Sequence, residues 1–150
     1  MHSTILQLET ILSAYEPLLL KLEEQSASYK PLPSKWSKKE LIGHLIDSAH
    51  NNLRRFIVAQ YEDKPLIKYA QDHWVLAAGY QDHRLNDLIA LWSLTNKHII
   101  HVLKKLPAGM EQREVLTESL HSIEWLAADY NKHLLHHLHQ VLELEPIAYT

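Results

Sequence analysis

The chain has 150 residues, a formal net charge of −3 and no cysteine. This length suits one domain with a substantial hydrophobic core. The small net charge argues against binding to nucleic acid or anionic lipid. The absence of cysteine excludes disulfides, thiolate metal sites and a cysteine nucleophile. No signal peptide is evident and no segment reaches the roughly 18 apolar residues of a membrane span, so we expect a cytoplasmic protein.

Two helices are expected in the first half of the chain. Apolar side chains at helical spacing predict the first helix over residues 4–27, and two prolines then hold an extended link. The second helix begins at Ser37, whose side chain can cap the free amide groups while Glu40 reaches back to form a capping box. This second helix runs to about residue 61.

A long connector, residues 62–83, separates the second helix from the third. Such a connector can cross the end of a bundle, so that helices two and three run parallel, or it can cover a site. Further helices are predicted over residues 84–106 and 117–143. No repeat or domain boundary interrupts the chain, and we therefore predict one all-α domain, a four-helix bundle, over residues 1–150.

Four histidines lie close together near the end of the chain, and two of them, His133 and His137, are spaced i, i+4. On a helix this spacing puts both imidazoles on one face, one turn apart, where they can reach one metal ion. At about 100° per residue, His137 falls on the apolar face of its helix and His133 at the edge of that face. His44 borders the apolar face of the second helix. Three helix-borne histidines are thus candidate ligands of an open metal site.

Ordinary structural roles stay open for these residues. A histidine at the edge of a helix face is usually a satisfied boundary residue, and a histidine run can be a nonspecific metal tract. Asn96 lies among inward-facing apolar residues, which indicates a polar pocket between helices because buried polar groups need partners. Arg55 could bind an anionic substrate, although a salt bridge to an acidic neighbour is the commoner role.

Several stretches of the chain together form a wider pattern: residues 35–48, Asn51, Arg55, Pro65, Tyr69, residues 71–75, Leu91, Trp92, Asn96 and residues 133–140. The last stretch has the order His, three residues, His, two residues, Gln. Over about residues 35–145 this pattern resembles the DinB-like superfamily, and especially its YfiT-like branch of metal-dependent hydrolases.

The resemblance implies a four-helix bundle with a long second-to-third connection and one divalent metal ion bound by His44, His133 and His137. Nickel or zinc is expected, with manganese or iron as alternatives, and a homodimer is also implied. Some relatives conjugate a low-molecular-weight thiol to electrophiles, and others are called hydrolases. We narrowly favour a thiol S-transferase acting on small molecules over hydrolysis by a metal-activated water. The thiol would come from a bound cosubstrate, because the chain has no cysteine.

Further residues receive roles around that ion. Gln140 and Asn51 are expected to orient ligands or substrate, and Asp47 is expected to fix an imidazole or act as a base. Contacts with substrate are expected from Arg55, Tyr69, Trp74 and Asn96. The alternative is a noncatalytic, stress-related binding or dimerisation module with a closed structural or vestigial metal site. Neither nucleic acid nor a membrane is an expected partner.

Overall fold

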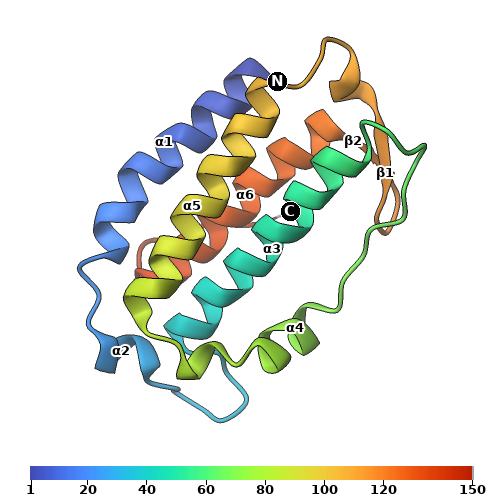
Figure 1. The fold of residues 1–150 in the computed structure, drawn as a ribbon. Helices are drawn as coiled ribbons and strands as arrows, with labels where there is room; N and C mark the ends of the chain where they lie inside the picture. The colour runs from blue at the N-terminus through green and yellow to red at the C-terminus, as the bar shows by residue number, and fades with distance from the viewer. Residues whose placement is uncertain (150) are drawn as a thin grey trace.

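Six α-helices and a two-stranded hairpin make up residues 1–149, the part of the chain that the computed structural model describes (Figure 1). The helices are α1 (His2–Leu19), α2 (Glu24–Ser28), α3 (Lys38–Val58), α4 (Gln71–Ala78), α5 (Leu85–Lys104) and α6 (Ile123–Val141). The strands are β1 (Glu114–Leu116) and β2 (Leu120–Ser122), and short 3₁₀ turns lie at Tyr80–Asp82 and Met110–Gln112. The four long helices form a bundle, which confirms the predicted fold class.

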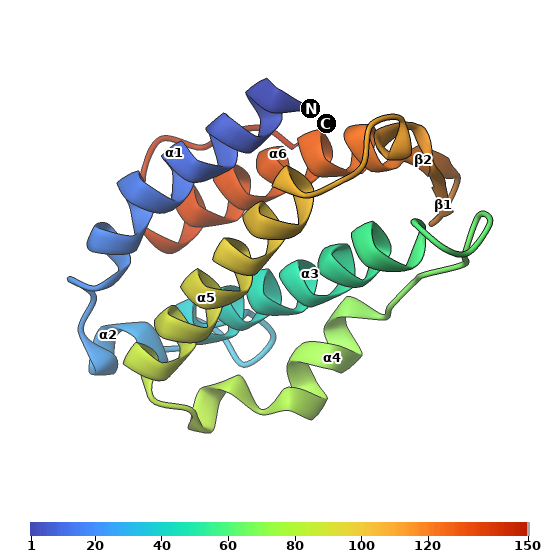
Figure 2. The ribbon, with the colours of Figure 1, turned by 45° about the horizontal axis from the view of Figure 1, so that its top comes forward.

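The bundle has an uncommon direction pattern. Helices α3 and α5 run in one direction, and α1 and α6 run in the other (Figures 1 and 2). Each long helix packs against its parallel neighbour and against one helix of the other pair, and the most extensive contact joins α3 to α5. The connector between these two helices therefore runs along the bundle and makes α3 and α5 parallel, which is one of the two roles that its length allowed.

The first predicted helix is wrong in its extent, because the chain bends after Leu19 and forms α2 as a separate short helix. The bend places Ala27 in the core with no exposed surface. It also directs the Glu24 carboxylate to two partners, the Lys39 ammonium at 2.7 Å and the Leu85 amide at 2.8 Å. One straight helix would forgo these contacts with α3 and α5.

The predicted start of the last helix is also wrong. Residues 114–122 form the β1–β2 hairpin, in which Glu114 pairs with Ser122 and Leu116 with Leu120. Val115 of this hairpin is fully buried. Ser122 then caps α6 by accepting a hydrogen bond from the Trp125 amide at 3.1 Å, so α6 begins at Ile123.

Helix α3 begins as the sequence predicts. The Ser37 hydroxyl accepts from the Glu40 amide at 3.2 Å, and the Glu40 carboxylate accepts from the Ser37 amide at 2.8 Å.

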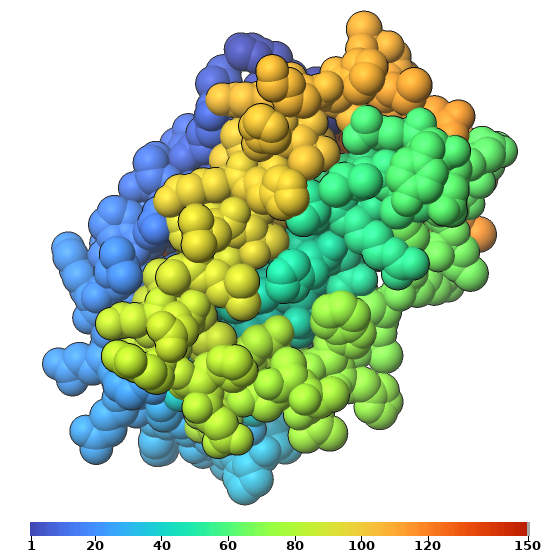
Figure 3. All heavy atoms as spheres, viewed as in Figure 1, coloured from blue at the N-terminus to red at the C-terminus, as the bar shows by residue number. Residues whose placement is uncertain are grey.

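The connector that follows α3 contains regular structure, since α4 and a 3₁₀ turn lie within it. In the space-filling view α4 lies against α3 on one face of the bundle (Figure 3).

Gly43 on α3 allows the connector to pack closely against this helix. The Tyr80 ring packs on the backbone of Gly43, where an added Cβ would lie 2.0 Å from a ring carbon. The Tyr80 hydroxyl donates a hydrogen bond to Asp47 one turn further along α3. Gly43 directly precedes His44, so this contact fixes the connector beside the candidate ligands.

No helix in residues 1–149 combines the length and apolar composition needed to cross a bilayer.

Candidate metal centre

Three histidines from two helices meet at one point. His44 comes from α3, and His133 and His137 come from adjacent turns of α6; one candidate ligand atom from each lies within 4.8 Å of the others. The Nε2 atoms of His44 and His133 are 3.0 Å apart. Two imidazole nitrogens that share a first-row metal ion at about 2.1 Å stand roughly 3.0–3.4 Å apart, depending on the coordination angle. The structure thus brings together the three residues that the sequence predicts as ligands.

Two of the imidazoles are oriented by oxygen atoms at their Nδ1 positions. His137 Nδ1 donates to the Gln140 side-chain oxygen at 3.0 Å, and the Ser48 hydroxyl lies 3.4 Å from His133 Nδ1. Partners of this kind fix the ring and leave Nε2 free to bind a metal ion. Gln140 therefore has the orienting position that the sequence predicts, while Ser48 is an addition from the structure.

Burial keeps these imidazoles uncharged. Desolvation, together with a smaller effect of neighbouring imidazoles, lowers the pKa of His44 to about 4 and that of His133 to about 2. The pKa of His137 is also lowered, again chiefly by desolvation. A metal ion binds the neutral imidazole, so three unprotonated rings at neutral pH are ready to bind one. The donor set and its geometry fit a divalent ion with at least one coordination position open.

Asp47 and Asn51 lie on α3 beyond His44, but they bind other groups. Asp47 is buried and accepts from the Tyr80 hydroxyl, and burial raises its pKa to about 6. The Asn51 amide donates to the Asp47 carbonyl oxygen at 2.9 Å. Among the described residues neither side chain is hydrogen-bonded to one of the three imidazoles. The structure therefore gives no contact through which Asp47 would orient a ligand.

Asn96 is not brought to the three histidines. It is fully buried on α5, where its amide donates to the Trp92 carbonyl oxygen at 2.8 Å. The Tyr130 hydroxyl donates to the Asn96 side-chain oxygen at 2.6 Å. The polar environment predicted around Asn96 is thus a hydrogen-bonded pair inside the core. Its effect on any ligand would pass through Tyr130.

A cavity of about 320 Å³ opens beside His133, and we call it the His133 cavity. Two of the predicted substrate contacts, Arg55 and Tyr69, line it, and Trp74 packs edge-on against Tyr69 with ring centroids 5.6 Å apart. Other lining side chains include Ser48, Asn52, Asp129 and Tyr149. Arg55, Tyr69 and the candidate ligand His133 therefore line the same cavity.

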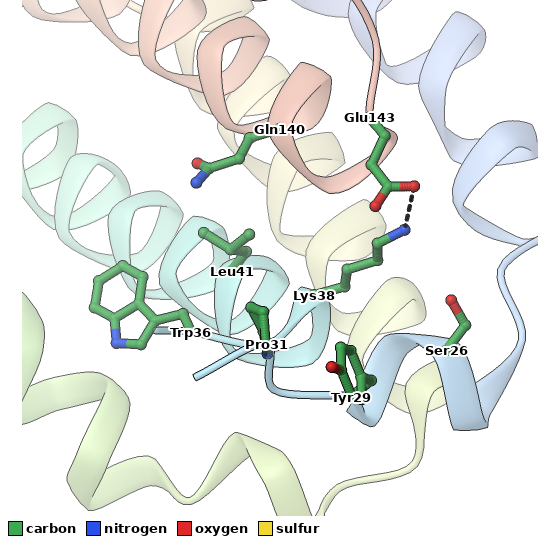
Figure 4. A pocket seen from close by; sticks show the side chains of 8 residues that line it. All are labelled: Ser26, Tyr29, Pro31, Trp36, Lys38, Leu41, Gln140 and Glu143. Carbon is green, nitrogen blue, oxygen red and sulfur yellow. Dashed lines mark ion pairs between the residues drawn. The ribbon is translucent and has the colours of Figure 1, made fainter. Parts of the chain in front are cut away.

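A second cavity, of about 430 Å³, lies between α2, the start of α3 and the end of α6 (Figure 4). We call it the Gln140 groove; Trp36, Leu41 and Gln140 line it together with Tyr29 and an ion pair between Lys38 and Glu143 at 3.2 Å. Trp36 packs on the His44 ring with centroids 5.1 Å apart, and Gln140 binds His137. The Gln140 groove thus adjoins the histidine cluster through Trp36 and Gln140, whereas His133 itself lines the His133 cavity.

The end of the chain also reaches the site, which the sequence did not indicate. After α6 the chain folds back, and the imidazoles of His136 and His139 bond the carbonyl oxygens of Ile147 at 2.6 Å and Glu145 at 2.7 Å. Tyr149 then lies edge-on against the His133 ring, with centroids 5.4 Å apart. The two extra histidines of the run thus hold this segment, residues 144–149, which we call the tail.

The sequence and the fold of the chain have counterparts in known proteins. A family model described as the DinB superfamily matches residues 7–141, most of the chain. The chain belongs to the DinB superfamily. This assignment confirms the resemblance that the sequence pattern indicated.

Individual DinB-superfamily relatives agree with this placement. A protein of Halalkalibacterium halodurans named "putative metal-dependent hydrolase" is 30% identical over 139 residues, which cover 89% of this chain and 80% of that protein. The solved structure of YfiT from Bacillus subtilis, described as "a probable metal-dependent hydrolase with an unusual four-helix bundle topology", has a TM-score of 0.84 at 18% identity. The match covers 95% of this chain and 83% of YfiT.

A further solved structure, a mycothiol-dependent maleylpyruvate isomerase, has a TM-score of 0.72 at 14% identity. The match covers 98% of this chain but 61% of the isomerase, so the isomerase has a substantial part without a counterpart here. At these identities the two solved structures establish a shared fold.

Proposed function

We propose that this protein is a divalent-metal-dependent enzyme that acts on small molecules and binds its ion through His44, His133 and His137. The observation that carries the proposal is the meeting of three uncharged imidazoles, one buried and two half-buried, within 4.8 Å beside a cavity that His133 lines. The name of the Halalkalibacterium halodurans relative supports a metal-dependent reaction. When bound, a divalent ion supplies Lewis acidity that lowers the pKa of a water or thiol it coordinates.

The protein's own groups would prepare this site in three ways. Gln140 and Ser48 hold two of the imidazoles in the orientation that frees Nε2. Burial keeps the rings unprotonated at neutral pH. The aromatic side chains of Tyr69, Trp36 and Tyr149 wall the cavities, which would exclude water from the reacting groups.

The His133 cavity and the Gln140 groove leave room for two organic molecules, and we propose thiol S-transfer as the activity. A low-molecular-weight thiol would occupy one cavity and an electrophile the other. The thiol sulfur forms a bond to the electrophilic carbon, the leaving group departs with its bonding electron pair, and the thiol proton passes to solvent. Since the chain has no cysteine, both reactants must be bound molecules.

Hydrolysis is the second candidate, favoured by the names of the Halalkalibacterium halodurans relative and of YfiT. It needs one organic substrate, so one of the two cavities would stay without a reactant. The nucleophile would then be water, and the products would form with no consumption of thiol.

The two candidates are separated by an assay of protein freed of metal and reloaded with Ni²⁺ or Zn²⁺. A low-molecular-weight thiol is offered with a panel of alkyl and aryl halides, and esters and amides are offered without thiol. We expect metal-dependent loss of thiol and formation of the thioether, absent in His133→Ala and retained in His98→Ala, since His98 is exposed on α5. Ester or amide cleavage alone would favour hydrolysis. Tightly held, non-exchanging metal without either activity would favour the noncatalytic module and refute the proposal.

A further inference from the structure

Arg55 presents a fixed guanidinium to the His133 cavity. The side chain comes from α3 and is half-buried. Its Nε and Nη2 atoms donate to the Ile67 carbonyl oxygen at 3.3 and 3.0 Å, and Nη1 donates to the Asn52 side-chain oxygen at 3.2 Å. These bonds hold the planar group in place, and a guanidinium carries five N–H groups in total, so N–H groups remain for a ligand.

The charge of Arg55 has no carboxylate partner. Within residues 1–149 no acidic oxygen lies within 4.0 Å of its guanidinium, so the salt bridge expected from the sequence is wrong. Its three acceptor contacts are made to neutral oxygens. Burial also lowers the pKa of Arg55, a sign that its charge is poorly solvated. Removing a charge from water is costly unless the charge is paired, and Arg55 is partly desolvated and lines a cavity, so the missing partner points to a ligand.

Two acidic residues share the cavity, but each binds elsewhere. Glu118 pairs with Lys68 at 3.0 Å, and Asp129 accepts from the Tyr149 hydroxyl at 2.8 Å. The negative charge of Asp129 still acts on Arg55 from a distance and favours its protonated form. The cavity thus offers one positive charge, on Arg55, and the negative charge of Asp129 lies at a distance from it. This arrangement suits a ligand group with one negative charge better than a group with two, because Asp129 would repel the second charge.

The surroundings of Arg55 suit the body of a small organic acid. The rings of Tyr69 and Tyr149 line the cavity, and its volume of about 320 Å³ is at the small end of the range for ligand sites. His133 lines the same space. A molecule whose acidic end binds Arg55 therefore extends toward the histidine cluster.

From these contacts we infer that the His133 cavity is a subsite for a carboxylate, which Arg55 binds through a charge-assisted, forked hydrogen bond. If the proposed function holds, the electrophilic substrate is a small carboxylic acid whose reactive atom faces the three histidines. The subsite itself depends on Arg55 and not on the metal ion. An experiment can thus refute the carboxylate subsite without refuting the proposed function, and the reverse.

Benzoate tests the inference, with the neutral amide benzamide as its matched control. Binding of both is measured by calorimetry to the full-length protein, metal-free and zinc-loaded. We expect the metal-free protein to bind benzoate about tenfold or more tightly than benzamide, and Arg55→Gln to remove that preference. Arg55→Lys keeps the charge but loses the fork, and should retain part of the preference.

Asp129→Asn provides a test that damage to the fold cannot imitate. Removing the distant negative charge should strengthen benzoate binding and leave benzamide binding unchanged. Equal binding of benzoate and benzamide, or an unchanged preference in Arg55→Gln, would overturn the inference, and tighter binding of phenyl phosphate would replace carboxylate with phosphate. A benzoate preference in metal-free protein that shows no metal-dependent activity would sustain the subsite and refute the proposed function alone.

Discussion

The Tyr149 ring lies edge-on against the ring of His133, with 5.4 Å between their centroids. Tyr149 also lines the His133 cavity, and its hydroxyl donates to Asp129. A residue at the end of the chain thus covers a candidate metal ligand. The tail owes its place to His136 and His139, whose ring nitrogens bind its carbonyl oxygens.

Removing the Tyr149 ring should expose the metal centre. In Tyr149→Ala we expect zinc to pass to a chelator several times faster than from the unmodified protein, because solvent gains access to His133. Tyr149→Phe keeps the wall and loses only the hydrogen bond to Asp129, so its rate should change little. The measurement is the rate of zinc transfer to a coloured chelator, with exposed Tyr61→Ala as the control. Equal rates in all variants would show that the tail does not cover the site.

Gly43→Ala should destabilise the fold through Tyr80. The added methyl group would lie 2.0 Å from a ring carbon, so the ring or the helix must move. Overpacking of this kind costs about 1–3 kcal/mol in the free energy of unfolding. Denaturant unfolding measures the cost, and Tyr80→Ala in the same chain makes room for the methyl group. The two changes together should therefore cost less than the sum of their separate effects, and simple additivity would contradict the contact.

Asp47→Asn should change how stability depends on pH in the metal-free protein. Burial raises the pKa of Asp47 from 3.8 to about 6, so its folded-state stabilisation is fully present below 3.8 and is lost as pH rises through 6. An asparagine stays neutral and can still accept from Tyr80. Between pH 4 and pH 8 the variant should therefore gain on the order of 1–3 kcal/mol relative to the unmodified protein. Urea unfolding at the two pH values measures this, and a pH-independent difference would exclude a raised pKa.

Much of the fold follows from local patterns, because helical periodicity and capping depend on residues close together in the chain. The capping box of Ser37 and Glu40 and the inward position of His44, His133 and His137 were predictable for this reason. The parallel direction of α3 and α5 was one of the two arrangements that the length of the connector between them allowed.

Other features depend on contacts between distant residues and left no periodic trace. The bend before α2 depends on Glu24 reaching Lys39 and Leu85. The β1–β2 hairpin is too short for an alternating pattern, and the tail is held by single hydrogen bonds. The position of Asn96 among apolar residues correctly predicted a polar contact inside the bundle, but only the fold shows that Tyr130 is its partner.

The low pKa values of the candidate ligands predict metal binding that resists acid. Protons compete with a metal ion only near the pKa of each ligand, and burial lowers the pKa of His44 to about 4 and that of His133 to about 2. Three imidazoles of ordinary pKa, about 6.5, would together lose several hundredfold in affinity between pH 7 and pH 5.5. We expect a far smaller loss here, measured by competition with a chelator of known pH dependence. A loss of several hundredfold would place the metal on exposed histidines.

Metal stoichiometry tests the central claim most directly. Metal-free protein is titrated with Zn²⁺ or Ni²⁺, and bound metal is measured after removal of excess ion. The account predicts one ion per chain, lost when His44, His133 or His137 is replaced by alanine and retained when the exposed α5 residues His98 and His101 are replaced. Unchanged binding in the first three variants would contradict the metal centre.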